Sequence, residues 1–96
     1  MMSGFSVETS PRFERLARKL AQDHRDFVQV YEQALAILRS DPFNRSRRHP
    51  IKKLKGVNDG DAAWRLRLRR FRFRYDVERS AVQLKLCSLR REDTYR

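Results

Sequence analysis

Apolar and basic residues alternate along residues 64–77 of this chain, in two runs that meet at Arg69 and Arg70. Successive side chains of a β-strand point to opposite faces, so this alternation predicts one apolar face and one basic face. The apolar face is expected to comprise Trp64, Leu66, Leu68, Phe71, Phe73, Tyr75 and Val77. The basic face is expected to comprise Arg65, Arg67, Arg72 and Arg74. The pattern therefore predicts two strands, at residues 63–68 and 71–77, that crowd arginine onto one surface.

Ahead of these strands, apolar residues recur every three or four positions, which predicts two helices. The first helix is expected over residues 11–22, because Ser10 followed by Pro11 is typical of a helix start. The second is expected to begin at Asp23 as its cap and to end near Ser40, because Asp41-Pro42 disfavours continuation. The short break between them indicates a helical hairpin.

Three other segments, residues 4–8, 51–55 and 81–87, are predicted strands. In the last of them, alternation places Val82, Leu84 and Leu86 toward the core. Gln83, Lys85 and Cys87 are then expected on the opposite face. The order β-α-α-β-β-β-β indicates a single domain over residues 1–96. Its expected class is α+β, with a helical hairpin packed on a small, mainly antiparallel, twisted sheet.

The charge balance is strongly basic. The 96 residues carry 23 Lys and Arg against 12 Asp and Glu, a formal net charge of +11 at pH 7. Such a domain is expected to bind nucleic acid or another polyanion. The alternative for the arginine-bearing surface is a solvated outer face of an antiparallel sheet.

Cellular location is suggested by cysteine content and hydropathy. Cys87 is the only cysteine, which excludes an internal disulfide and a cysteine-built metal site. A reducing, cytoplasmic setting is therefore expected. No apolar run approaches the roughly 20 residues that span a bilayer, so no membrane association is expected. Residues 1–10 do not resemble a secretion signal.

The arginine pattern suits chemistry on RNA. An RNA strand carries its own nucleophile, the 2′-hydroxyl, so a protein can promote cleavage by orienting it and stabilising charge on the phosphate. Guanidinium groups provide forked donors for phosphate, and no metal or other cofactor is expected. The general base stays open: His24 is expected in the helical hairpin, His49 in a loop, and Glu92 or Asp93 near the C-terminus.

Four blocks of sequence, in order, resemble the RelE/ParE superfamily of bacterial type II toxins. They are residues 51–56 (IKKLKG), 64–67 (WRLR), 71–76 (FRFRYD) and 87–95 (CSLRREDTY). The resemblance implies a RelE-like fold and an mRNA interferase, a ribosome-dependent endoribonuclease that cuts mRNA in the A site and inhibits translation. It also implies a cognate antitoxin that wraps the toxin in a hetero-oligomer.

The same resemblance implies roles for individual residues. Arg65 and Arg67 fall where RelE-like nucleases contact and activate the substrate, and Arg72 falls where an arginine stabilises the scissile phosphate. Arg90 falls where another arginine supports the leaving oxygen. Arg91 is the alternative, because the interval to Tyr95 is one residue shorter than in the RelE pattern. Tyr95 falls where an aromatic residue stacks on a base.

Further contacts to RNA are expected from the remaining basic residues, namely Lys52, Lys53, Lys55, Arg74 and Arg91. Trp64 is expected in the core rather than on a base, because it alternates in step with Leu66. Two other functions remain open. One is a ParE-like inhibitor of DNA gyrase, a branch that generally lacks the basic catalytic set together with Arg90 and Tyr95. The other is a non-catalytic RNA-binding relative.

Overall fold

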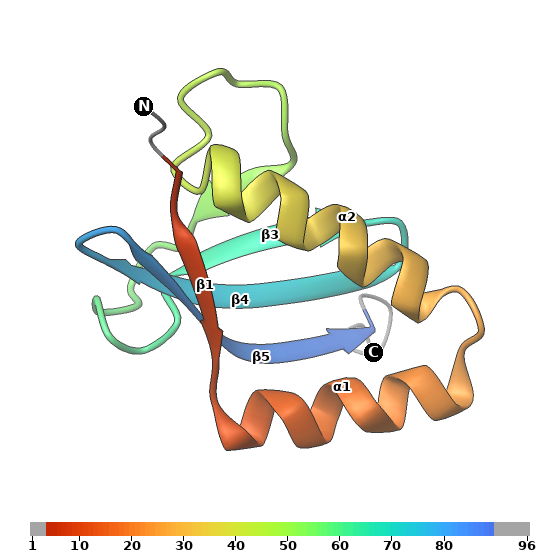
Figure 1. Cartoon of the computed structure of the whole chain (residues 1–96). Helices are drawn as coiled ribbons and strands as arrows, with labels where there is room; N and C mark the ends of the chain where they lie inside the picture. Colours follow the sequence, from red (N-terminus) through yellow and green to blue (C-terminus); the bar gives the residue numbers. More distant parts are fainter. Residues whose placement is uncertain (1–3, 90–96) are drawn as a thin grey trace.

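The computed structural model describes residues 4–89, which form two helices and five strands in the predicted order (Figure 1). The helices are α1 (Pro11–Asp23) and α2 (Phe27–Ser40). The strands are β1 (Ser6–Thr9), β2 (Ile51–Lys53), β3 (Trp64–Leu68), β4 (Phe71–Glu78) and β5 (Ala81–Leu89).

The strands form one sheet in the order β1-β5-β4-β3-β2. The pair of β1 and β5 is parallel, and the other three pairs are antiparallel. Helix α2 lies across one face of the sheet, whereas α1 runs alongside β5 (Figure 1). The prediction of an α+β domain with two helices on a mainly antiparallel sheet is therefore confirmed.

Helix α1 begins as the sequence predicts. The hydroxyl of Ser10 accepts a hydrogen bond from the backbone N–H of Phe13 at 3.0 Å, and Pro11 occupies the first turn. The predicted start of α2 is wrong, because Asp23 closes α1 and Asp26 is the residue that precedes α2. The Asp26 carboxylate makes no cap bond to α2 and instead accepts a hydrogen bond from the Arg70 guanidinium at 2.8 Å. A long-range ion pair thus replaces the local cap.

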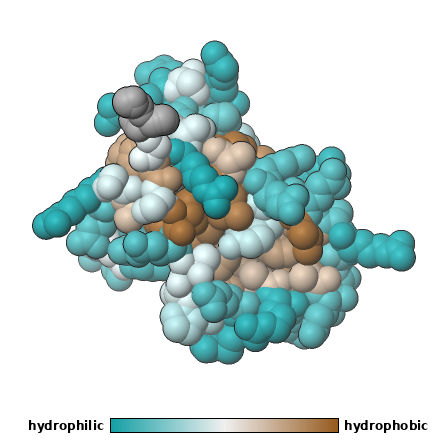
Figure 2. Space-filling view, in the orientation of Figure 1, coloured by the Kyte–Doolittle hydropathy of each residue, from teal (hydrophilic) through white to brown (hydrophobic). Residues whose placement is uncertain are grey.

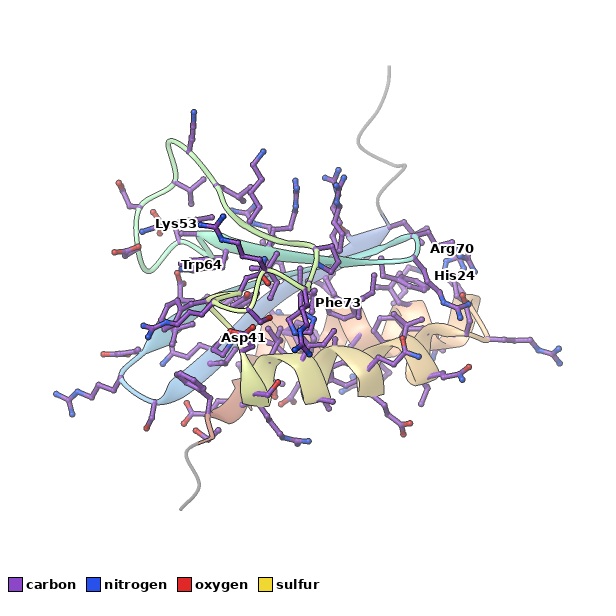
Figure 3. All side chains as sticks on the ribbon, turned by 90° about the horizontal axis from the view of Figure 1, so that it is seen from above. His24, Asp41, Lys53, Trp64, Arg70 and Phe73 are labelled. Atoms are coloured by element: carbon purple, nitrogen blue, oxygen red, sulfur yellow. The ribbon has the colours of Figure 1, made fainter. Side chains whose placement is uncertain are left out.

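Aromatic rings form the contact between α2 and the sheet. The Phe27 ring lies 5.2 Å from Phe71 and 6.1 Å from Phe73, and Tyr31 stacks on both Phe27 and Phe73. Phe73 lies between the sheet and α2 in Figure 3. Burial of these rings stabilises the fold because it removes large apolar surfaces from water. Figure 2 shows a largely hydrophilic surface with apolar patches between α1 and α2.

A β-bulge alters the predicted facing of β5. Arg74 pairs with Leu86 and Tyr75 pairs with Leu84, so Lys85 is the extra residue between them. Beyond the bulge the alternation of β5 is inverted. Cys87 is 4% exposed and belongs to the core, whereas Leu86 lies across from Arg74 on the other face. The predicted inward position of Leu86 and outward position of Cys87 are therefore wrong.

Candidate nucleic-acid interface

The arginine face, formed by Arg65, Arg67, Arg72 and Arg74, lies on the side of the sheet opposite the aromatic core. In the register of β3 and β4, Arg67 is directly opposite Arg72, and Arg65 is directly opposite Arg74. All four residues are half-buried. Side chains tipped with nitrogen project from the sheet away from the helices (Figure 3). Because like charges placed directly across a sheet cost stability, this arrangement needs a functional explanation.

Two nitrogens of the Arg74 guanidinium hold the loop that precedes β3. Its Nε and Nη2 donate to the carbonyl oxygen of Ala62 at 3.0 and 2.9 Å, and Nη2 also reaches the carbonyl oxygen of Asp61 at 3.3 Å. These bonds fix the loop before β3 against the open side of the sheet. The predicted RNA contact of Arg74 stays a prediction, but its guanidinium also positions this loop.

Asp76, which the residue pattern did not mark as a site residue, fixes the same stretch of loop through its N–H groups. Asp76 is buried, and its carboxylate accepts hydrogen bonds from the backbone N–H groups of Gly60, Ala62 and Ala63 at 2.8–3.1 Å. Lys85 Nζ lies 2.8 Å from Asp76 Oδ2 and donates to the Gly60 carbonyl oxygen at 2.7 Å. Asp76 is two residues beyond Arg74, so its position on this face could have been read from the sequence.

The pKa of Asp76 reflects two opposing effects. Burial by itself raises the pKa, because a low-dielectric surrounding disfavours the charged carboxylate. Hydrogen bonds from Lys85 and from the three backbone N–H groups favour the charged form and lower the pKa below its ordinary value. Asp76 is therefore an ionised anchor for the loop. Its negative charge is balanced by Lys85 and by the backbone N–H groups of the loop.

The predicted lysine contacts do not share one surface. Lys52 pairs with Arg65 in the register of β2 and β3 and so extends the arginine face. Lys53 pairs with Trp64, lies 5.8 Å from the centre of its ring, and forms an ion pair with Asp59 at 3.3 Å (Figure 3). Lys55 is exposed beyond the end of β2. The register thus joins Lys52, but not Lys53, to the arginine face.

Trp64 packs against the core, as expected. Its ring lies 5.3 Å from Phe43 and 6.5 Å from Tyr75. The Tyr75 hydroxyl is buried and donates to the carbonyl oxygen of Pro42 at 2.7 Å, and burial raises the pKa of Tyr75 above its ordinary value. Trp64 therefore helps to hold the chain that follows α2 against the sheet.

Both histidines are engaged away from the arginine face. His24 Nδ1 lies 3.3 Å from Arg70 Nη1 at the turn between the helices (Figure 3). His49 Nε2 lies 3.8 Å from Asp41 Oδ2, and Asp41 is held by the Ser46 hydroxyl, which lowers the Asp41 pKa. These side-chain contacts of the histidines are with residues outside the arginine face.

Cys87 is also unsuited to a reactive role. Its thiol is buried in the core, and burial raises the pKa of Cys87 to about 12.

Within residues 4–89, no three His, Cys, Asp or Glu side chains gather in a way that could hold a metal ion. None of the helices in the same range combines the length and hydropathy of a membrane span.

The remaining predicted site residues, Arg90, Arg91 and Tyr95, and the candidate acids Glu92 and Asp93, lie outside the described residues. Their roles stay predictions.

Comparisons of the chain with protein-family models, with curated proteins and with solved structures found no match. The functional inference therefore starts from the geometry of the arginine face.

Proposed function

We propose that this chain is the toxin of a bacterial type II toxin–antitoxin system, a RelE-like endoribonuclease that cleaves mRNA in the ribosomal A site. The observation that supports this most directly is the facing pair Arg67 and Arg72, flanked by Arg65 on the same strand as Arg67. Guanidinium groups on neighbouring strands suit the oxygens of a single phosphodiester. The net charge of +11 also favours a polyanionic target.

The proposed reaction uses the nucleophile of the substrate. The 2′-hydroxyl of a ribose gives up its proton to solvent and attacks the adjacent phosphorus, and the bond to the 5′-oxygen breaks. The leaving 5′-oxygen takes up a proton from solvent, so the products carry a 2′,3′-cyclic phosphate and a 5′-hydroxyl. Arg72 stabilises the charge that builds on the phosphoryl oxygens, and Arg65 and Arg67 orient the ribose and phosphate. The resemblance to RelE assigns support of the leaving oxygen to Arg90 and base stacking to Tyr95.

The proposed partners follow from the same surface. A cytoplasmic toxin that binds RNA through a cationic surface needs a cognate antitoxin, which we expect to cover the arginine face with acidic side chains in a hetero-oligomer. The ribosome presents mRNA in a fixed conformation, which reduces the entropic cost of aligning the 2′-hydroxyl with the phosphorus.

A non-catalytic RNA-binding protein is the second candidate, and the histidines favour it. His24 faces Arg70, and His49 faces Asp41, so neither is placed to take the 2′-hydroxyl proton. In this alternative the arginine face binds phosphate without cleaving the strand. Growth arrest, if present, would then come without new RNA ends.

Replacement of Arg72 by alanine tests the proposal. Induced expression of the wild-type chain in bacteria is expected to arrest growth and to produce transcript ends within translated codons. Arg72→Ala is expected to relieve the arrest and to slow cleavage by about 10²–10³-fold, the effect of removing one transition-state donor. The control is Arg39→Ala, which removes the same charge from an exposed position on α2 and should stay toxic.

The possible outcomes separate the candidate functions. Equal toxicity of Arg72→Ala and the wild-type chain would reject the site. Broken or linear DNA and inhibited gyrase, without codon-centred RNA ends, would instead indicate a ParE-like gyrase inhibitor. RNA binding that is weakened by Arg72→Ala, in a chain that produces no RNA ends, would indicate the non-catalytic protein.

A further inference from the structure

The β-bulge at Lys85 places an apolar residue among the arginines. Leu86 pairs with Arg74, and Ser88 pairs with Arg72, so both are on the side of the sheet that bears the arginine face. A regular strand would have directed Leu86 into the core. Its half-buried position beside charged groups therefore needs an explanation of its own.

Leu86 lines a hollow between α1 and the arginine face. The hollow has a volume of about 300 Å³, at the lower end of the range for small-ligand sites. Leu16 from α1 and Leu86 supply apolar surface, whereas Arg12, Arg72 and Arg74 supply positive charge and Ser88 supplies a hydroxyl. Arg12 precedes Leu16 by one helical turn, so both lie on the same side of α1. The hollow thus combines apolar walls with cationic groups.

This combination matches one nucleotide of a single strand. A nucleobase has flat apolar faces that pack on leucine, polar edges that bond to hydroxyl and guanidinium groups, and an attached phosphate that Arg12 or Arg72 can contact. A hydrophobic peptide would offer no acceptor to the exposed Arg12, and a bare phosphate would leave the leucines unused. The mixed lining therefore favours RNA over either of those occupants.

We propose that this hollow binds one base of the RNA strand whose phosphate lies on Arg67 and Arg72, with Leu86 and Arg12 as the residues that recognise it. The proposal rests on the function proposed above and adds a subsite to it. A neighbouring hollow of about 350 Å³ shares Arg12 and Leu86 and extends toward Asp61 and Lys85. The two hollows therefore adjoin near the start of α1.

The subsite can be tested by binding alone, without cleavage. The probe is a fluorescently labelled hexanucleotide with 2′-O-methyl groups, which block the nucleophile. A second set of hexanucleotides lacks one base at each position in turn. Leu86→Ala and Arg12→Gln are each expected to weaken binding about fivefold or more, as does loss of one stacked base. The control is Arg15→Gln, which removes the same charge from an exposed position of α1 outside the hollow.

The decisive result is whether the effects of Leu86→Ala and of removing one base on RNA affinity are non-additive. If one base occupies the hollow, the strand that lacks this base should bind Leu86→Ala as well as it binds the wild-type chain. If Leu86→Ala lowers the affinity for every strand by the same factor, the subsite is overturned. The same holds if Arg12→Gln weakens RNA binding no more than Arg15→Gln does. Thermal unfolding by circular dichroism confirms that each variant is folded, and Leu86→Met offers a second variant if Leu86→Ala is not.

Three further results separate this proposal from the proposed function. Strong competition by free mononucleotides would assign the hollow to a free nucleotide and would overturn the RNA subsite. RNA binding that depends on Arg72 but not on Leu86 or Arg12 would reject the subsite and leave the nuclease proposal intact. Failure of the wild-type chain to bind any of the hexanucleotides would reject the subsite, whereas the nuclease proposal is decided separately by transcript ends formed on the ribosome.

Discussion

Asp76 illustrates how a single side chain defines the boundary of the arginine face. Its carboxylate accepts hydrogen bonds from three backbone N–H groups of the loop before β3 and pairs with Lys85. Arg74 holds carbonyl oxygens of the same loop. Arg74 and Asp76 thus fix both the acceptors and the donors of one loop, and this loop borders the arginine face.

Replacement of Asp76 by asparagine should reveal this role through pH dependence. The lowered pKa means that the charged carboxylate stabilises the folded chain above the unfolded pKa of about 3.9, and that this stability is lost as the pH falls. At pH 7 we expect Asp76→Asn to lower the free energy of unfolding by about 1–3 kcal/mol.

Urea unfolding of both chains between pH 7 and pH 3 provides the measurement. The difference in free energy of unfolding should shrink as the pH falls below the unfolded pKa of about 3.9, because the carboxyl of the unfolded wild-type chain then binds a proton that folding must release. Asp59→Asn is the control, since the Asp59 side chain is 83% exposed. A difference that is independent of pH would show that the charge of Asp76 does not stabilise the loop.

At the scale of elements, aromatic side chains hold α2 against one face of the sheet, and the arginine face lies on the opposite face of the same strands. Phe27 contacts Phe71 and Phe73, which alternate with Arg72 along β4. The side chains that bind α2 and the side chains proposed to bind RNA therefore belong to the same strand. Packing of α2 thereby determines how rigidly Arg72 is presented.

Truncation of Phe27 tests the contribution of this packing. Phe27→Ala should lower the free energy of unfolding by about 3–5 kcal/mol, because a buried ring is lost and a cavity remains. Val28→Ala is the matched control on the next residue, whose side chain is 53% exposed, and should change stability by no more than about 0.5 kcal/mol. Chemical denaturation monitored by Trp64 fluorescence gives both values. Similar losses for the two variants would contradict the assigned core.

The whole molecule separates its two kinds of surface across one sheet. Apolar side chains of β3, β4 and β5 meet the helices, and the arginine face lies on the other side. The chain carries a net charge of +11, so long-range attraction of a polyanion is a property of the molecule and not of one residue. The affinity for RNA should therefore fall as the salt concentration rises, with contributions from basic residues over the whole surface.

Salt dependence measures how many phosphates the surface contacts. Affinity for single-stranded RNA should fall steeply as salt is raised, because each neutralised phosphate releases a counterion. Arg67→Ala should reduce the slope of log affinity against log salt by about 0.7, the value for one phosphate of a single strand. Arg39→Ala on α2 should leave the slope nearly unchanged. A flat salt response of the wild-type chain would exclude phosphate docking.

Sequence patterns predicted most of the fold because they express local physics. Alternation with a period of two identified the two faces of β3 and β4, and the cap at Ser10 located the start of α1. The errors occurred where distant residues compete with local signals. Asp26 pairs with Arg70 instead of capping α2, and the bulge at Lys85 interrupts the alternation of β5.

By itself, the sequence determined the α+β class, the order of its elements and the presence of an arginine-bearing surface, because each depends on the spacing of neighbouring side chains. The tertiary structure alone decided that Asp76 holds the loop and that Leu86 lines a hollow beside α1. These features depend on strand register and on contacts such as that between Lys85 and Gly60, which are 25 positions apart. Local periodicity carries no information about such pairings, because packing of the complete chain selects among the possible registers.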